Sequence, residues 1–297
     1  MKKALIFAAS VCAFSWAMSG VFYAVLGGDI ESYRIAFRIF CTVYMFFPMI
    51  TALLLQWRSK ERLTSTGLLA FKPRWSWLVA MVLPLVLVAL TVLFSALVPG
   101  AVLEYSPDQL INMSGLDEKS ASIVRLQFEK TPLSVMIVSG IVNGIMAGCT
   151  INAVAAFGEE YGWRNYMVSA LRGTKFCKAA LVIGAVWGIW HAPIILMGHN
   201  YPQHPVAGIF LMAAFCILIG FIELYLVKKA GSVYPAAIFH GTINAVGGFV
   251  FYLVQGGSDL TTGVTGAAGF VAEAVVCLAI FLYDKHISRD NIITSEL

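Results

Sequence analysis

Two adjacent glutamates, Glu159 and Glu160, stand one glycine after a long apolar run, and Arg164 follows them in the string EEYGWR. Ionisable side chains at membrane depth are costly and usually mark a reaction site or an ion path. On a helix, residues four apart share a face, so Glu160 can pair with Arg164 while Glu159 points elsewhere. We therefore expect Glu159 to be the free carboxylate and a candidate general base. The alternative is an ordinary ion pair on a solvated helix surface at the start of a cytoplasmic loop.

Two histidines in later apolar runs extend this set. His191 stands in WGIWHAPI, where Pro193 removes a backbone donor and breaks the helix, and such breaks usually line a cavity. Trp187, one turn earlier, either walls the imidazole or simply packs. His240 and Asn244 in FHGTIN are four apart, so they share a face and form a donor pair suited to a developing oxyanion. The alternative for a single buried histidine is a hydrogen-bonded packing residue, but two histidines beside a glutamate pair favour a reaction site.

Composition identifies the elements that must position these residues. With 59% hydrophobic and 12% charged residues and a mean hydropathy of +0.82, the chain is expected to be an all-α, polytopic membrane protein. Apolar runs long enough for a core of about 30 Å predict eight transmembrane helices, at residues 4–26, 37–57, 76–98, 134–157, 179–197, 206–227, 232–254 and 263–283. These bounds leave Glu159 at the membrane boundary, whereas His191 lies about 18 Å from the inner end of its span.

The distribution of basic residues predicts the orientation. With the N-terminus in the cytoplasm, fifteen of the twenty Lys and Arg residues fall on the inner side, so we expect both termini to be cytoplasmic. The net charge of +4 is then a topology signal and gives no indication of nucleic-acid binding. The six cysteines contain no CxxC pair and are expected to be small core residues. Because no connection is long enough for a soluble domain, residues 1–297 form a single transmembrane domain in this interpretation.

The strings EEYGWR, WGIWHAPIILMGHNYP and YPAAIFHGTIN resemble the three motifs of the CPBP family, the CAAX prenyl protease and bacteriocin-processing membrane proteins. That family's pattern is EExxxR, FxxxH and HxxxN in order on an eight-helix bundle, and here Trp187 replaces the usual Phe. The resemblance covers roughly residues 134–250, within a protease core at about 134–254. It implies an intramembrane endopeptidase whose site opens to the cytoplasm, in which Glu159 with His191 activates water and His240 with Asn244 stabilises the oxyanion.

Two chemistries stay open for this site. The absence of HExxH and of a thiolate set favours a metal-free reaction that uses Glu159, Glu160, Arg164, His191, His240 and Asn244 and needs no cofactor. The alternative is a zinc ion held by Glu159, His191 and His240. The expected partners are the bilayer and a peptide or membrane-protein substrate, with or without a lipid group, in a prokaryotic plasma membrane. A transporter and a non-catalytic membrane regulator are the other function classes considered.

Overall fold

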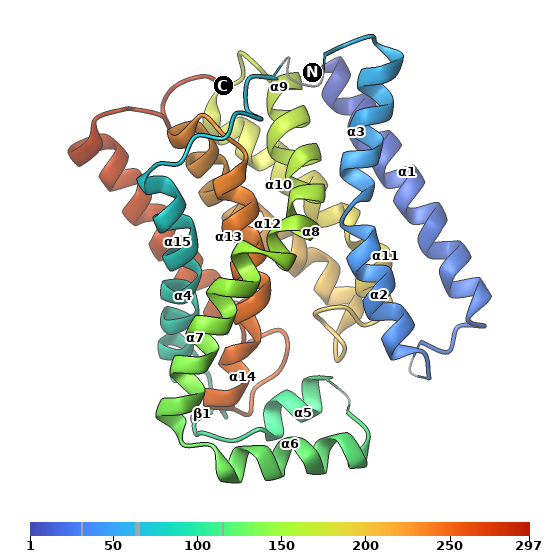
Figure 1. Ribbon diagram of the computed structural model, residues 1–297, viewed down its shortest axis with the longest axis vertical. Coiled ribbons are helices and arrows are strands. Elements are labelled where there is room, and N and C mark those ends of the chain that lie inside the picture. The colour runs from blue at the N-terminus through green and yellow to red at the C-terminus, as the bar shows by residue number, and fades with distance from the viewer. Residues whose placement is uncertain (31, 63–65, 115) are drawn as a thin grey trace.

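The computed structural model describes residues 1–30, 32–62, 66–114 and 116–297. Helices hold 73% of the residues and strands 2%, which confirms the all-α prediction (Figure 1). The elements in chain order are α1 (Lys2–Val25), α2 (Arg34–Tyr44), α3 (Phe47–Arg58), α4 (Trp75–Ser95), β1 (Val102–Leu103), α5 (Asp108–Ser114), α6 (Glu118–Lys130), α7 (Leu133–Cys149), α8 (Ile151–Glu160), the π-helix η2 (Tyr161–Met167), α9 (Val168–Ala170), α10 (Phe176–Trp190), α11 (Ala192–Leu196), α12 (Pro205–Ala230), α13 (Tyr234–Val246), the 3-10 turn η3 (Gly247–Phe249), α14 (Val250–Leu253), β2 (Val254–Gln255), α15 (Ala267–Leu282) and the π-helix η4 (Tyr283–Ser288).

Long apolar helices make this a multi-pass membrane protein. Within the described residues, six helices are long and apolar enough to cross a bilayer, namely Lys2–Val25, Arg34–Arg58, Trp75–Ser95, Pro205–Ala230, Tyr234–Leu253 and Ala267–Ser288. A seventh is counted if α6 and α7, which meet at 113°, form one broken span. The predicted number of eight is therefore not reached, although six of the eight predicted runs coincide with these helices.

The two predicted runs without a long helix of their own are 134–157, which ends just before Glu159, and 179–197, which carries His191. In the first, α7 ends at Cys149 and α8 begins at Ile151. The helical path then continues through η2 and α9 to Ala170, well past the predicted end at residue 157. In the second, α10 is only 15 residues long and stops at Trp190. The break follows from Pro193 at the start of α11, as expected.

Because the helical path continues past residue 157, Glu159 and His191 both lie well inside the bundle. Glu159 lies 11 residues before the end of the helical path at Ala170, or about 16 Å at 1.5 Å per residue. His191 follows the start of α10 by 15 residues, about 22 Å. Both residues are thus inside the bundle, far from the ends of their helical paths at the termini end. A hydropathy window ends at a charge, whereas the helix continues because these charges are paired inside the protein.

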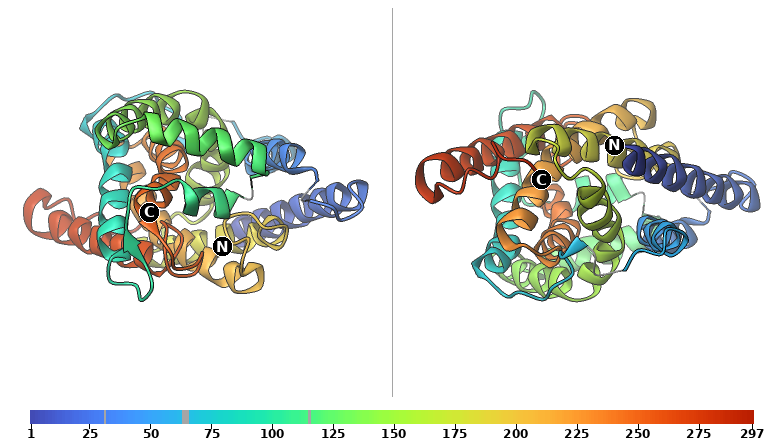
Figure 2. Two further views of the ribbon diagram at one scale, coloured as in Figure 1. Left: turned by 90° about the horizontal axis from the view of Figure 1, so that it is seen from below. Right: turned by 90° about the horizontal axis from the view of Figure 1, so that it is seen from above.

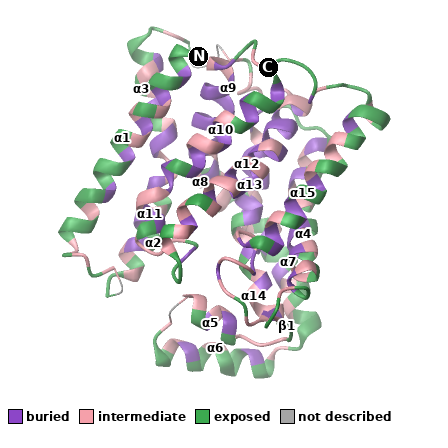
Figure 3. Ribbon diagram, turned by 180° about the vertical axis from the view of Figure 1, so that it is seen from behind, coloured by how far each residue is buried: buried purple, intermediate pink, exposed green. Residues whose placement is uncertain are grey.

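The buried centre of the bundle consists of α10, α12 and α13, and α1, α3, α4 and α15 lie on its outside (Figure 3). The outer helices present apolar side chains outwards, among them Leu5, Trp57, Leu78 and Val271. In a membrane protein these exposed side chains face lipid instead of water.

Two glycines allow α10 and α12 to approach closely. A Cβ atom at Gly184 would lie 2.7 Å from the carbonyl oxygen of Cys216, and one at Gly188 would lie 2.9 Å from the backbone nitrogen of Ala213. Gly184 and Gly188 are four apart and so share a face, which is the small-residue packing typical of membrane helices. This close packing holds Trp187 of α10 and Glu223 of α12 within reach of one side chain, Arg164, which contacts both.

The bundle has two distinct ends. Both chain termini lie at one of them, here named the termini end, where Met1 contacts Ala170 and the amide of Phe176 donates to Ser295 (Figures 1 and 3). The opposite end, here named the far end, contains α5, α6 and the antiparallel pair β1–β2, and α5 and α6 lie across it (Figures 1 and 2).

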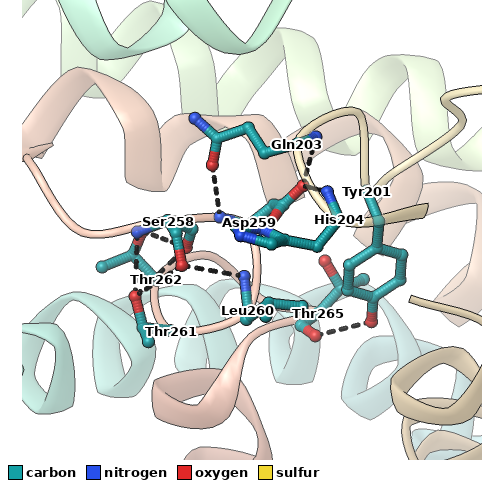
Figure 4. Close-up of polar contacts among 9 residues, drawn as sticks. All are labelled: Tyr201, Gln203, His204, Ser258, Asp259, Leu260, Thr261, Thr262 and Thr265. Carbon is teal, nitrogen blue, oxygen red and sulfur yellow. Dashed lines mark hydrogen bonds and ion pairs between the residues drawn. The ribbon is translucent and has the colours of Figure 1, made fainter. Parts of the chain in front are cut away.

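Two loops at the far end are held together by polar contacts (Figure 4). Asp259, only 2% exposed, accepts from the backbone amides of Gln203 and His204 at 2.7 and 3.2 Å and contacts Nδ1 of His204 at 2.6 Å. The hydroxyl of Tyr201 donates to the carbonyl of Thr265 at 2.7 Å. The segment that leads from α11 into α12 is therefore anchored to the loop before α15.

Candidate active site

The string EEYGWR lies where an α-helix changes into a π-helix. Glu159 and Glu160 are the last residues of α8, and Arg164 is in η2. Glu159 is 2% exposed and the other two are fully buried. The guanidinium of Arg164 contacts Glu160 at 3.3 Å, which confirms the predicted pairing. Short π-helical segments are frequent at functional sites because they shift side chains out of the regular helical register.

Arg164 has two further partners that the sequence did not reveal. Its Nη2 forms an ion pair with Glu223 of α12, and its Cζ lies 4.2 Å from the centre of the Trp187 ring. Glu223 has no partner at helical spacing in its own helix, so spacing alone does not predict what it binds. The structure supplies that partner from a segment about 60 positions earlier in the chain.

Trp187 is the central contact of the site. Its indole Nε1 donates to Oε2 of Glu159 at 2.6 Å. Its backbone carbonyl lies 2.8 Å from Nδ1 of His191, and since a carbonyl can only accept, Nδ1 carries the proton. A neutral His191 then has Nε2 as its free acceptor. Sequence reasoning treated Trp187 only as a wall or a packing residue, because the spacing between Glu159 and Trp187 has no helical meaning.

His240 and Asn244 come from α13. Nδ1 of His240 lies 2.9 Å from Oε1 of Glu160, and its ring centre lies 5.4 Å from that of Trp187. Because Glu160 also binds Arg164, it is the acceptor and Nδ1 of His240 is the donor. Asn244, one turn further along, is exposed to the cavity described next.

One cavity of about 770 Å³ brings the predicted groups together. Glu159, His191, His240 and Asn244 all line it, although they come from three separate segments. Glu160 and Arg164 are not among its lining residues and lie behind them. The lining also includes polar side chains that sequence reasoning missed, among them Arg34, Arg38, Tyr44, His199 and Asn200. The two arginines were regarded only as charges of the outer side, and their one-turn spacing on α2 was the available signal.

The cavity extends towards the far end. Its lining includes Leu110 and Met113 of α5, Pro202 and Thr265 of the anchored loops, and none of the residues at the termini end that the structure describes. Two expectations from the sequence are therefore incompatible. The site and both termini could all face the cytoplasm only if the cavity opened at the termini end. The cavity instead extends to the opposite end of the bundle.

Three buried residues at the back of the site have the types that bind metals. Glu160, Glu223 and His240 each offer an atom, and these atoms lie within 4.8 Å of one another. This set differs from the predicted alternative, Glu159 with the two histidines. Arg164 pairs with both carboxylates of the observed set. A cation would have to compete with this guanidinium, so the cluster fits a network of ion pairs better than a zinc site.

Comparison with known proteins covers the part of the chain that contains this site. Residues 129–246 match the family model described as type II CAAX prenyl endopeptidase, Rce1-like, and this range contains all six predicted site residues. Over 139 residues the chain is 27% identical to CAAX prenyl protease 2 of Methanococcus maripaludis, an alignment that covers 44% of this chain and 48% of that protein. The matched part is thus about half of the relative's length. Together with the three motifs, these two findings support the assignment of this chain to the CPBP family of CAAX prenyl proteases.

Proposed function

We propose that this protein is an intramembrane endopeptidase that hydrolyses a peptide bond with a water molecule activated by Glu159. The observation that supports it best is the convergence of Glu159, His191, His240 and Asn244 on one cavity inside an apolar bundle. Ionisable side chains in such a position are costly, so their convergence needs a functional explanation.

Glu159 and His191 are the groups that hold and deprotonate the water. The indole of Trp187 orients Oε2 of Glu159, which leaves Oε1 for the water. With its proton on Nδ1, His191 presents Nε2 as an acceptor for the second water hydrogen. As the water oxygen attacks the carbonyl carbon, its proton passes to Glu159. When the C–N bond breaks, Glu159 returns that proton to the leaving amine, because Nε2 in this tautomer has none to give.

His240 and Asn244 are the donors for the tetrahedral oxyanion. Glu160 and Glu223 bring two negative charges next to Arg164, which supplies one positive charge. A protonated His240 brings this cluster to neutrality and carries a second N–H on Nε2, available to the oxyanion. Removal of one such donor costs a factor of about 10² to 10³ in kcat in comparable sites.

The proposed reaction is metal-free. Carboxylate and imidazole groups are zinc ligands in other hydrolases, where the metal polarises the carbonyl and acidifies water. Here Arg164 already pairs with the carboxylates of the ligand-like set, and Glu159 already accepts a hydrogen bond from Trp187. These contacts favour Glu159 itself as the base.

The substrate class follows from the cavity. Its volume of about 770 Å³ and its mixed apolar and polar lining suit an extended peptide segment of a few residues. The similar protein of Methanococcus maripaludis is named a CAAX prenyl protease, so a peptide with a lipid group is one candidate substrate. We propose a prokaryotic plasma membrane as the site of action.

The direct test is hydrolysis of internally quenched peptides by the purified protein in detergent. We expect Glu159→Gln and His240→Ala each to abolish cleavage while the folded yield is kept, and Asn244→Ala to reduce kcat by about 10² to 10³. Retained turnover in Glu159→Gln would contradict the mechanism. Complementation of a deletion strain by Glu159→Ala would instead favour a non-catalytic regulator.

A further inference from the structure

The two ends of the bundle carry very different charges. Fourteen of the twenty Lys and Arg residues lie at the termini end, in its loops, helix ends and terminal segments, and they are Lys2, Lys3, Arg58, Lys60, Arg62, Lys72, Arg74, Arg172, Lys175, Lys178, Lys228, Lys229, Lys285 and Arg289. These segments contact one another directly, for example where the amide of Val233 donates to Leu68 at 2.9 Å and Lys3 pairs with Glu61 at 2.5 Å. They therefore form one basic surface.

The far end holds only five basic residues, which are Arg34, Arg38, Lys119, Arg125 and Lys130. Two of them, Arg34 and Arg38, line the cavity. Arg125 pairs with Asp108 at 3.2 Å and with Glu118 at 3.5 Å. Positive charge that faces the surrounding medium is thus concentrated at the termini end.

Basic residues near the ends of membrane helices mark the cytoplasmic side of a membrane protein. The loops of the termini end are short, which is the condition under which this rule applies. The termini end is accordingly the cytoplasmic side. Since the cavity runs from Glu159 towards α5 at the far end, the cavity faces away from the cytoplasm.

We infer that this protein takes its substrates from the non-cytoplasmic face of the membrane, as peptide segments that have already crossed it. This inference rests on the proposed peptidase function. It names the substrate class as exported peptides or the external loops and tails of membrane proteins, in place of the cytoplasmic chain ends that a site open to the cytoplasm would process.

Thiol labelling from each side of the membrane tests the sidedness without any need for activity. The test variant carries Met113→Cys, on α5 and in the cavity lining, with all six native cysteines replaced by serine. The matched control keeps only native Cys177, which is exposed near the start of α10 at the termini end. A membrane-impermeant maleimide is applied to intact cells and to inside-out vesicles.

We expect the Met113→Cys thiol to react in intact cells and Cys177 to react only in inside-out vesicles. The reverse pattern would overturn the inference. A second readout uses a quenched peptide that the detergent-solubilised protein cleaves, added outside right-side-out and inside-out vesicles, with Glu159→Gln as the blank. Cleavage confined to inside-out vesicles would overturn the inference but support the peptidase. Cleavage no faster than the blank in both preparations would contradict the proposed function, while the labelling still decides the sidedness.

Discussion

At the scale of single residues, Trp187 connects the groups of the proposed site, because it contacts Glu159, Arg164, His191 and His240. Its indole holds Glu159, its ring lies under Arg164 and against His240, and its carbonyl sets the tautomer of His191. The family pattern usually has Phe at this position, and Phe has no N–H to donate. The Trp187 hydrogen bond is therefore a feature of this chain, and we expect it to position the carboxylate for catalysis.

Trp187→Phe should lower kcat by about 10- to 100-fold with little change in KM, because hydrogen bonds to charged groups contribute about 1.5–3 kcal/mol. The phenyl ring keeps the contacts with Arg164 and His240. The matched control is Trp163→Phe, since the indole nitrogen of buried Trp163 has no hydrogen-bond partner among the described residues. Steady-state cleavage of a quenched peptide measures both variants. Equal kcat values in the two would show that the indole does not position Glu159.

Glu223→Gln should reduce the free energy of unfolding by about 3 kcal/mol, the lower bound for breaking a buried ion pair. Glu223 is fully buried and pairs with Arg164, so its neutralisation leaves the guanidinium with Glu160 alone. Thermal unfolding in detergent is the measurement, with exposed Glu104→Gln as the control. An unchanged melting temperature in Glu223→Gln would mean that Glu160 suffices to balance Arg164.

Chelation by EDTA or 1,10-phenanthroline should leave the cleavage rate unchanged, and elemental analysis of the purified protein should find no stoichiometric zinc. The reason is the pairing of Arg164 with the carboxylates that a metal would need. Loss of activity on chelation that added zinc restores would contradict the metal-free reaction and favour the zinc alternative.

At the scale of elements, the site depends on helices that are interrupted where a regular span would continue. The change from α8 to η2 sets the direction of Glu159 and Glu160, and the break between α10 and α11 leaves His191 at the cavity. Irregular backbone at membrane depth is tolerated where it lines a polar cavity. The close packing of α10 on α12 then determines whether Trp187 and Glu223 reach the groups that they bind.

Gly184→Ala should destabilise the protein by about 1–3 kcal/mol, because the added methyl group meets the backbone of α12 and the helices must separate. We also expect a lower kcat, since separation moves Trp187 away from Glu159. Gly20→Ala on α1 is the control, because a Cβ atom there has open space. Thermal unfolding and peptide cleavage should be measured together. Wild-type values of both for Gly184→Ala would show that this contact does not position the site.

At the scale of the whole molecule, the two chain termini lie at one end of the bundle and α5 lies at the other (Figures 1 and 2). The cavity lining includes Leu110 and Met113 of α5, so the cavity extends to the end opposite the termini. Termini at the same end require an even number of membrane crossings. The six long helices give an even number, and the α7–α9 path and α10 with α11 form a further pair that runs to the termini end and back.

We expect fluorescent-protein fusions at the N-terminus and at the C-terminus to behave alike. Both should fluoresce in a bacterial host, with a fluorescent protein that matures in the cytoplasm but stays dark when it is exported. The two fusions should give the same result because both termini lie at the same end of the bundle. Both should fluoresce because the basic surface places that end in the cytoplasm. Fluorescence of only one of the two fusions would contradict the arrangement of the bundle, and two dark fusions would reverse the orientation.

Sequence alone was sufficient to predict the class of the protein and to name the side chains that the structure brings to one cavity. Local hydropathy identified six long spans, and the spacing of Glu160 and Arg164 and of His240 and Asn244 identified pairs on common helix faces. These properties depend on residues within one helix, and helical geometry is known in advance. The same reasoning ended the fourth span at residue 157, whereas the helical path continues to Ala170, because a hydropathy window cannot recognise a charge that a distant residue neutralises.

Tertiary structure alone decided the contacts between helices. Trp187 with Glu159, Arg164 with Glu223 and His240 with Glu160 join segments 28 to 80 positions apart, and no local periodicity encodes such pairs. It also decided the direction of the cavity, because that direction depends on which ends of α2, α5 and α13 remain open after packing. The physical reason is that secondary structure follows from neighbours in the chain, whereas a buried polar site follows from neighbours in space.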